Sequence, residues 1–207
     1  VSGDDIRAFL TGARQTLHRE TALLDARTKA GRVRRCHGDL HLRNIVLLDG
    51  IPTPFDALEF DEELGTCDVL YDLAFLLMDL RHRGLDMAAN AVMNAWLRVS
   101  ETETDLAGLS VLPLFISLRA AISAMVAVQT ARARGGDAAV LDDARRYLAD
   151  ACTALVPVAP RLIAIGGLSG TGKTTLARTL SPGIGPVPGA IHLRSDRRDG
   201  PFVAVNC

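Results

Sequence analysis

The apolar residues of this chain recur three and four positions apart over most of residues 1–157, and this spacing constrains the fold more than any other feature. Such a period places them on one face of a helix. The helices expected on this basis cover residues 4–30, 66–83, 85–99, 104–134 and 137–155. Pro113 should break the fourth helix near its start, because proline removes a backbone donor. The sequence therefore predicts a mostly helical unit.

One short stretch near the front of the chain has a different pattern. Val33 begins a short strand, and residues 45–48 form a second strand that ends at the hairpin dipeptide Asp49-Gly50. Residues 52–60 should supply the returning strand. Residues 1–157 thus predict an α+β domain in which a small hairpin accompanies the helices.

Composition excludes several classes of protein. Of the 207 residues, 48% are hydrophobic and 23% are charged, which is the balance of a globular domain and not of a disordered or collagen-like chain. Lys and Arg number 23 against 24 Asp and Glu, so the net charge is −1 and no basic field is available to attract nucleic acid. Aromatic residues, at 4%, are too few to favour base stacking.

Cysteine usage and the apolar stretches indicate a cytoplasmic protein. The four cysteines form no C-x-x-C pair, so neither a zinc site nor a redox dithiol is expected. The chain opens with Val1 and has no secretory signal pattern, which favours a start inside a longer reading frame. The longest apolar stretch, residues 106–131, is interrupted by Pro113 and Arg119, so we expect buried helices there and not a membrane span.

Residues 158–207 have a different sequence pattern, and this pattern predicts the start of a second domain. Residues 162–165 form an apolar run typical of a buried parallel strand, and residues 173–180 have helical spacing. Between them, Gly167 to Thr174 fit the pattern G-x-x-x-x-G-K-[ST] at every fixed position. About 50 residues are too few for a complete α/β domain, since one βαβ unit needs about 30.

The chemistry of this glycine-rich motif, the P-loop, is specific. Its glycines let backbone N–H groups curl around phosphate oxygens, and the following helix directs its positive end at the same anion. Lys173 would reach the β- and γ-phosphates, and the Thr174 hydroxyl would bind Mg²⁺. The predicted nucleotide-binding residues are Gly167, Leu168, Ser169, Gly170, Thr171, Gly172, Lys173, Thr174 and Thr175. A glycine-rich turn that binds nothing is the alternative.

Residues 190–193 read as the next strand, and Asp196 follows it. This order resembles P-loop small-molecule and polynucleotide kinases, in which an aspartate after the second strand activates the acceptor hydroxyl. On that resemblance Asp196 is a candidate general base. A helix-capping aspartate is the competing interpretation.

The polar loop from Cys36 to Asn44 is the second group of residues that carries chemistry. Asp39 and Asn44 lie five positions apart on a loop between strands and can face one point. The carboxylate of Asp39 could accept a hydroxyl proton, while the amide oxygen of Asn44 coordinates Mg²⁺.

The sequence HGDLHLRN in this loop resembles the catalytic loop of the aminoglycoside phosphotransferase family, relatives of the eukaryotic protein kinases. The resemblance implies the mostly helical C-terminal lobe of a protein-kinase-like fold, with ATP and Mg²⁺ as cofactors. It also makes Asp39 the catalytic base, Asn44 a metal ligand and His37 the residue that holds the loop. The second metal carboxylate is expected on the next strand, where Asp56 fits best and Glu59 is a competitor.

Asp72, in Tyr71-Asp72-Leu73-Ala74, resembles the buried aspartate that supports the catalytic loop through backbone N–H groups. A buried carboxylate needs such partners. The family's N-terminal lobe, with its ATP-binding lysine, has no counterpart here, since Lys29 is the only lysine before His37. The whole arrangement resembles a bacterial family of fused phosphotransferase and ATP-binding proteins, of which this chain would be a middle fragment.

The resulting expectation is an ATP-dependent phosphotransferase that acts on a small-molecule hydroxyl, fused to a P-loop module. One alternative places the chemistry in the P-loop region with the front domain as a substrate-binding or regulatory partner, and another is a non-catalytic nucleotide-binding fragment. The oligomeric state is not readable from the sequence. His18, His82 and His192 are interpreted as solvated or capping residues, and the cluster of Arg32, Arg34 and Arg35 as a solvated strand edge.

Overall fold

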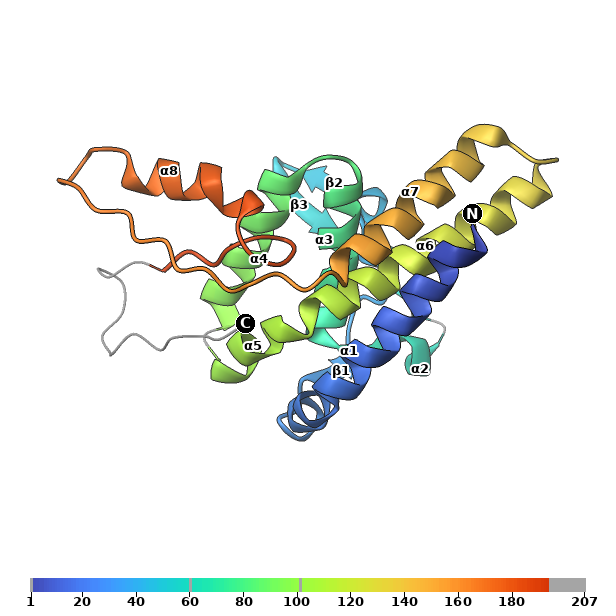
Figure 1. The fold of residues 1–207 in the computed structure, drawn as a ribbon, viewed down its shortest axis with the longest axis horizontal. Coiled ribbons are helices and arrows are strands. Elements are labelled where there is room, and N and C mark those ends of the chain that lie inside the picture. Colours follow the sequence, from blue (N-terminus) through green and yellow to red (C-terminus); the bar gives the residue numbers. More distant parts are fainter. Residues whose placement is uncertain (1, 60, 101, 194–207) are drawn as a thin grey trace.

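A computed structural model describes residues 2–59, 61–100 and 102–193 of the chain (Figure 1). Its elements in chain order are α1 (Gly3–Lys29), β1 (Val33–Arg35), the 3₁₀ turn η1 (Leu42–Asn44), β2 (Ile45–Leu48), β3 (Ile51–Pro54), α2 (Glu62–Gly65), β4 (Thr66–Asp68), α3 (Val69–His82), α4 (Asp86–Ser100), α5 (Glu103–Ala107), η2 (Gly108–Ser110), α6 (Leu112–Ala133), α7 (Ala138–Ala154), α8 (Lys173–Leu180) and η3 (Ser181–Gly183). The mixed, helix-rich architecture agrees with the C-terminal lobe expected from the sequence.

The core lies where α3 and α7 pack against α6, and α1 covers the outer side of α6 and α7 (Figure 1). Apolar side chains from α3, α6 and α7 fill it. Its fully buried members include Leu70, Ala74, Leu77, Leu112, Leu114, Ile116, Ala120 and Ala151. Each buried leucine or isoleucine contributes about 1.5–3 kcal/mol, so this contact is the main source of stability.

Helix α6 begins at Leu112, with Pro113 in its first turn, where a missing N–H costs nothing. The helix expected over 104–134 is thus divided into α5, η2 and α6, as Pro113 indicated. Within the described ranges, α6 is the one helix that is long and apolar enough to cross a bilayer by length and composition alone. Its contacts with α3 and α7 account for that apolar character.

Two antiparallel strand pairs flank residues 37–44. In the hairpin, Leu48 pairs with Ile51, and Asp49 and Gly50 adopt φ values of 51° and 79° in the turn. The hairpin is confirmed, but its returning strand ends at Pro54, before Asp56 turns the backbone with φ 60°. The second pair joins β1 to β4, so residues 66–68 extend a sheet and do not begin a helix. Helix α3 instead starts after Asp68, whose side chain accepts a hydrogen bond from the Leu70 N–H.

The predicted parallel strand before the P-loop is wrong in this structure. Residues 162–165 form no strand, and Leu162 is 91% exposed. A parallel strand needs neighbours on both edges, and the described strands pair only with each other. Residues 190–193 likewise form no strand, whereas the helix at 173–180 forms as predicted. The boundary placed near residue 157 stays a prediction, and so does the second domain.

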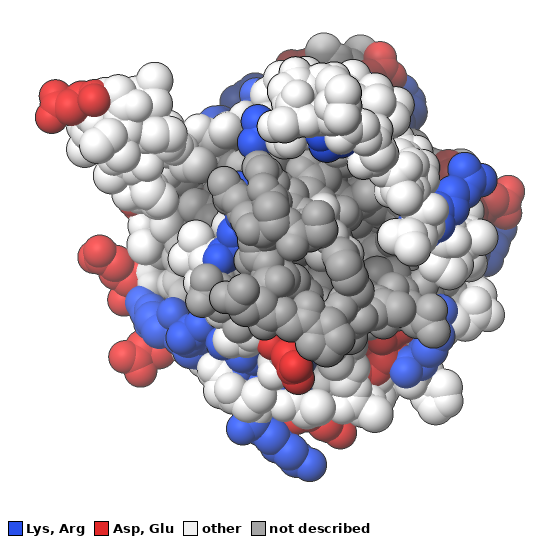
Figure 2. Space-filling view, turned by 90° about the vertical axis from the view of Figure 1, so that its left-hand side faces the viewer, with Lys and Arg blue, Asp and Glu red and all other residues white. Residues whose placement is uncertain are grey.

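Charges of both signs lie on one face of the molecule. Figure 2 shows Lys and Arg side chains interspersed with Asp and Glu around the described part of one face. This pattern agrees with the net charge of −1.

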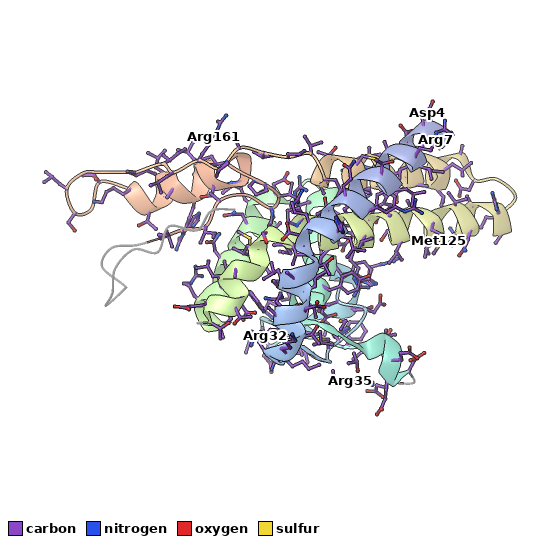
Figure 3. All side chains as sticks on the ribbon, turned by 60° about the horizontal axis from the view of Figure 1, so that its bottom comes forward. Asp4, Arg7, Arg32, Arg35, Met125 and Arg161 are labelled. Carbon is purple, nitrogen blue, oxygen red and sulfur yellow. The ribbon has the colours of Figure 1, made fainter. Side chains whose placement is uncertain are left out.

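A buried ion-pair cluster joins α1 to β4 and α5. The guanidinium of Arg27, with no exposed surface, bonds both oxygens of Asp68 at 2.7 Å and lies 3.4 Å from Asp105. Arg32 binds the other side of Asp105. The interpretation of Arg32 as part of a solvated edge is therefore wrong, whereas Arg34 and Arg35 are exposed. Figure 3 shows Arg32 and Arg35 at the same end of the molecule.

His82 is buried, in contrast to the expectation of a solvated or capping residue. Its ring stacks on Tyr147 with centroids 3.6 Å apart. Nδ1 lies 2.7 Å from Asp150 and Nε2 lies 3.0 Å from Asp143, and both carboxylates belong to α7. The residue therefore ties the end of α3 to α7. His18, by contrast, is exposed on α1.

Candidate active site

Two side chains of helix α3 bind the backbone of loop 37–44. The Asp72 carboxylate accepts the backbone N–H bonds of His37, at 3.1 Å, and Gly38, at 2.8 Å. Asp79 accepts the N–H of Leu42 at 2.9 Å. Both aspartates are buried, at 8% and 5% exposure, so each backbone bond to them is charge-assisted.

Asp39 and Asn44 of this loop lie within hydrogen-bond distance of each other. The Asn44 Nδ2 donates to the Asp39 carbonyl at 3.0 Å and to its carboxylate Oδ2 at 2.9 Å. Asn44 is buried at the end of η1, whereas the side chain of Asp39 is 40% exposed. The carboxylate is thus fixed in position and open to solvent on one side, and the amide oxygen of Asn44 is not used by these two bonds.

His37 connects the loop to the chain that leaves the hairpin. Its Nε2 lies 2.9 Å from the carbonyl oxygen of Phe55, and its own carbonyl accepts the N–H of Leu58 at 2.9 Å. The N–H of Phe55 in turn donates to the Asn44 carbonyl at 3.0 Å. Residues 55–58 therefore run alongside both ends of the loop.

The two candidate metal carboxylates lie on this same segment. Asp56 follows Phe55 and Glu59 follows Leu58, and both side chains are exposed. Within residues 37–59 neither carboxylate hydrogen-bonds to the loop. Asp56 adopts φ 60°, a left-handed conformation that ordinary residues avoid and that clusters at functional sites. Asp49 in the hairpin turn adopts a similar φ, so the backbone leaves both Asp56 and Glu59 as candidates.

The donor atoms here suit Mg²⁺, which prefers oxygen ligands and keeps several waters. They are the amide oxygen of Asn44 and the carboxylates on residues 55–59. In the described part of the chain, no group of three or more His, Cys, Asp or Glu side chains could hold a metal by itself.

Two residues that support the loop were not singled out from the sequence. His41 is buried, packs edge-on against Phe75, and places Nε2 3.4 Å from the Asp39 carboxylate. Arg119 of α6 donates to the Gly38 carbonyl at 3.2 Å and lies 4.0 Å over the Tyr71 ring. The available signal for Arg119 was its position within the apolar stretch 106–131, since a buried charge needs hydrogen-bond partners.

Two half-buried cysteines, Cys36 and Cys67, lie beside the loop. Burial raises the pKa of Cys67 to about 12, with smaller contributions from Cys36 and Asp72. Burial, followed by Asp72, also raises the pKa of Cys36. A raised pKa favours the neutral thiol over the thiolate at both positions.

The P-loop sequence forms an exposed turn before α8. Gly167, Gly170 and Gly172 adopt φ values of 149°, 79° and 83°, which side chains with a Cβ avoid. The Lys173 ammonium donates to the carbonyls of Gly167, at 2.7 Å, and Leu168, at 2.5 Å. Lys173 thus folds back over the turn, whereas Ser169, Thr174 and Thr175 are exposed.

The two groups of predicted residues lie on different parts of the molecule. Loop 37–44 is supported by α3, whereas α8 contacts α4 and lies at the far end of a long connection from α7 (Figure 1). In the described ranges, no hydrogen bond joins the loop to residues 167–175. Asp196 lies outside the described residues.

Comparison with known proteins identifies a family whose sequence model includes loop 37–44. The sequence model of a family described as "Phosphotransferase enzyme family" matches residues 5–110, about half of the chain, including the whole of loop 37–44. The chain is 34% identical over 186 residues to uncharacterized proteins of Mycobacterium bovis and Mycobacterium tuberculosis. That alignment covers 89% of this chain but 36% of each relative, so the chain spans about a third of their length. No solved structure matches the chain.

Proposed function

Because the chain belongs to the phosphotransferase enzyme family, we propose that it is an ATP-dependent enzyme that phosphorylates a hydroxyl group of a small molecule. One observation supports the proposal most: the Asn44 Nδ2 donates one hydrogen bond to the Asp39 carboxylate and one to the Asp39 backbone carbonyl, and 40% of the Asp39 side chain stays exposed. A fixed, accessible carboxylate is what a general base for an alcohol requires.

In this proposal Asp39 accepts the proton of the acceptor hydroxyl as that oxygen attacks the γ-phosphorus of ATP. The bond from the γ-phosphorus to the bridging oxygen breaks, and ADP leaves with the electron pair. His41, 3.4 Å from the same carboxylate, orients it from the buried side. Asp72 and Asp79 keep the loop from moving while the charge redistributes.

The amide oxygen of Asn44 and the carboxylate of Asp56, with Glu59 as the alternative, would hold Mg²⁺. When bound, this ion supplies charge neutralisation for the transferring phosphoryl group. The exposed side chains of Asp56 and Glu59 can approach a nucleotide without first breaking a hydrogen bond to the loop.

A second nucleotide site at residues 167–175 is favoured by the three glycines with positive φ and by the position of Lys173 at the start of α8. On nucleotide binding, the Lys173 ammonium would give up its hydrogen bonds to the Gly167 and Leu168 carbonyls and would bind the β- and γ-phosphates of ATP instead. Thr174 and Thr175, in the first turn of α8, would provide hydroxyl groups for Mg²⁺ and the nucleotide. If Asp196 were the base there, the chemistry would belong to this region and the helical domain would be its partner.

The acceptor is a small molecule in this proposal, and neither a membrane nor a nucleic acid is a partner. The mixed surface charge supports that exclusion. A cytoplasmic location, where ATP is abundant, fits the same proposal. Because the alignment covers only 36% of each relative, the activity of the whole protein belongs to the proposal as well.

The test compares transfer of labelled phosphate from ATP to a panel of sugars, amino alcohols and aminoglycosides by the full chain and its variants. Asp39→Asn should abolish transfer and leave Mg·ATP binding, measured by calorimetry, intact. Asp49→Asn is the matched control, because Asp49 lies in the exposed hairpin turn and asparagine tolerates its left-handed φ.

Each alternative has its own outcome in this experiment. Transfer that survives in Asp39→Asn and disappears in Lys173→Ala would move the chemistry to the P-loop region. Binding of Mg·ATP that is lost only in Lys173→Ala, without transfer by any form, would leave a nucleotide-binding module that has no catalytic role.

A further inference from the structure

Two buried asparagines on α4 have no role in the proposed chemistry. Asn90 and Asn94 are 2% and 3% exposed. They lie four residues apart, so their side chains are neighbours on one face of the helix. A buried amide without partners costs free energy, so their hydrogen bonds identify what this face of α4 is built to hold.

The partner of both asparagines is the backbone of residues 188–192. The Asn90 Nδ2 donates to the carbonyls of Pro188, at 3.2 Å, and Ala190, at 3.0 Å. The Asn94 Nδ2 donates to the same Ala190 carbonyl at 3.2 Å. The Asn94 Oδ1 accepts the N–H of His192 at 2.7 Å. Every second residue therefore turns a backbone group toward α4, as every second residue of a strand does toward its neighbour.

The opposite side of this segment is bound by η3. The N–H of Ala190 donates to the Ser181 carbonyl at 2.9 Å, and the His192 ring contacts the hydroxyl of Ser181. Ala190 is thus bonded through its carbonyl to α4 and through its N–H to η3. Val187 and Ile191 add apolar contacts with the core.

Gly189 is required at the centre of the segment. A Cβ at this position would lie 2.3 Å from the Ser181 carbonyl oxygen and 3.0 Å from the Asn90 Nδ2. Its φ of 109° is also unfavourable for any residue with a side chain. The close approach of three elements at Gly189 indicates a built contact and not an incidental one.

We propose that Asn90 and Asn94 form a docking site that recognises the backbone of a glycine-containing turn and of the residues that follow it. Its occupant is the chain's own segment 187–192. The site fixes the residues that follow α8 and η3 against α4, and so attaches the P-loop region to the helical domain. Because the asparagines satisfy this backbone, the site also explains why residues 190–193 do not pair as a strand. The inference does not depend on nucleotide binding or on catalysis.

Hydrogen exchange of segment 184–192, measured by mass spectrometry on the full chain, tests the docking site. The wild-type segment should be protected, and Gly189→Ala should raise its exchange rate about tenfold or more, since several backbone bonds are lost together. Gly183→Ala is the matched control, because a Cβ there meets nothing within 4 Å. This control should exchange at the wild-type rate.

A second variant tests the α4 side of the contact. Asn94→Ala should raise the exchange of the same segment, while the unfolding transition of the helical domain, followed through the fluorescence of the single tryptophan, Trp96, is still present. Gly189→Ala lies outside the helical domain, so its effect cannot be attributed to misfolding of α4. An unprotected wild-type segment, or equal exchange rates in wild type, Gly189→Ala and Asn94→Ala, would overturn the proposal.

Discussion

Asp72 and Asp79 lie seven residues apart on α3, and each holds one end of loop 37–44 by accepting backbone N–H bonds. Seven residues are about two helical turns, so both carboxylates lie on the face that α3 turns toward the loop. Asp39 lies between the two anchored ends. Its position is therefore set by a core helix and not by the loop itself.

Replacing Asp79 by alanine should loosen the loop without removing a group that touches substrate. The Leu42 N–H and the Arg83 guanidinium, which lies 3.0 Å from Asp79, would both lose their acceptor. We expect a loss of about 1–3 kcal/mol in the free energy of unfolding, typical of hydrogen bonds to a charged group. Phosphoryl transfer should fall by about 10- to 100-fold through misplacement of Asp39.

The measurements are urea unfolding and steady-state transfer rates. Asp25→Ala, at an exposed position on α1, is the control and should match the wild type in both. Unchanged stability and rate in Asp79→Ala would show that the loop holds its position without α3.

The buried cluster around Arg27 should be the most sensitive ion pair of the fold. Arg27→Met removes the guanidinium that bonds both oxygens of Asp68, and leaves that carboxylate buried beside Asp105. Breaking a buried pair from one side costs about 3–5 kcal/mol, which should be visible as a lower thermal midpoint.

Arg7→Met is the matched control for Arg27→Met. Arg7 is 74% exposed at the opposite end of α1, next to Asp4 (Figure 3), so its removal should change the midpoint little. Equal midpoints in the two variants would contradict a structural role for the cluster.

The sequence was sufficient for those features that local rules determine. Asp49-Gly50 specifies a turn with positive φ, and Pro113 specifies a helix start, so the hairpin and the beginning of α6 were predictable. Asp39 and Asn44 lie close together because their separation along one loop already limits the distance between them.

Features that depend on distant partners were not predictable. His82 appears solvated in sequence because its neighbours Asp143 and Asp150 lie more than 60 residues away. Asp79 has no distinguishing feature in the sequence, because its role depends on the loop that packs against it. The apolar run at 162–165 has the composition of a strand, but without strands beside it the backbone cannot pair.

Acid should weaken the contact between α3 and α7 through Asp143. Burial of Asp143 raises its pKa, but hydrogen bonds from His82 and Arg146 outweigh burial and hold the pKa below its ordinary value of 3.8. A carboxyl with a lowered pKa adds stability that is complete above the ordinary value and is lost as the pH falls through the folded one. Asp143→Asn should therefore be less stable than the wild type at neutral pH.

Thermal midpoints across the acid range check this dependence. The difference between wild type and Asp143→Asn should be constant above about pH 5 and should shrink below pH 3.8. Asp142→Asn, at a carboxylate that is 70% exposed, should follow the wild-type curve at every pH. A difference that persists unchanged into strong acid would exclude the charge of Asp143 as its cause.

His192 should make the docking of segment 187–192 sensitive to pH near neutrality. Burial lowers the pKa of His192 below 6.5, and Arg178 of α8 and Arg98 of α4 lower it further. The docked state therefore favours the neutral imidazole. The stability of the docked state is complete well above pH 6.5 and is lost as the pH falls through 6.5 toward the lowered pKa, because the released segment binds the proton more tightly.

Hydrogen exchange of residues 184–192, corrected for the intrinsic effect of pH on exchange, measures this loss. Wild-type protection should decrease between about pH 7.5 and 5.5, the range in which histidine titrates. His192→Gln has no titrating group at this position, so its protection should be independent of pH over the same range. His18→Gln, at an exposed position on α1, should retain the wild-type decrease. A decrease that persists in His192→Gln would assign the effect to another group and leave the docking site independent of His192.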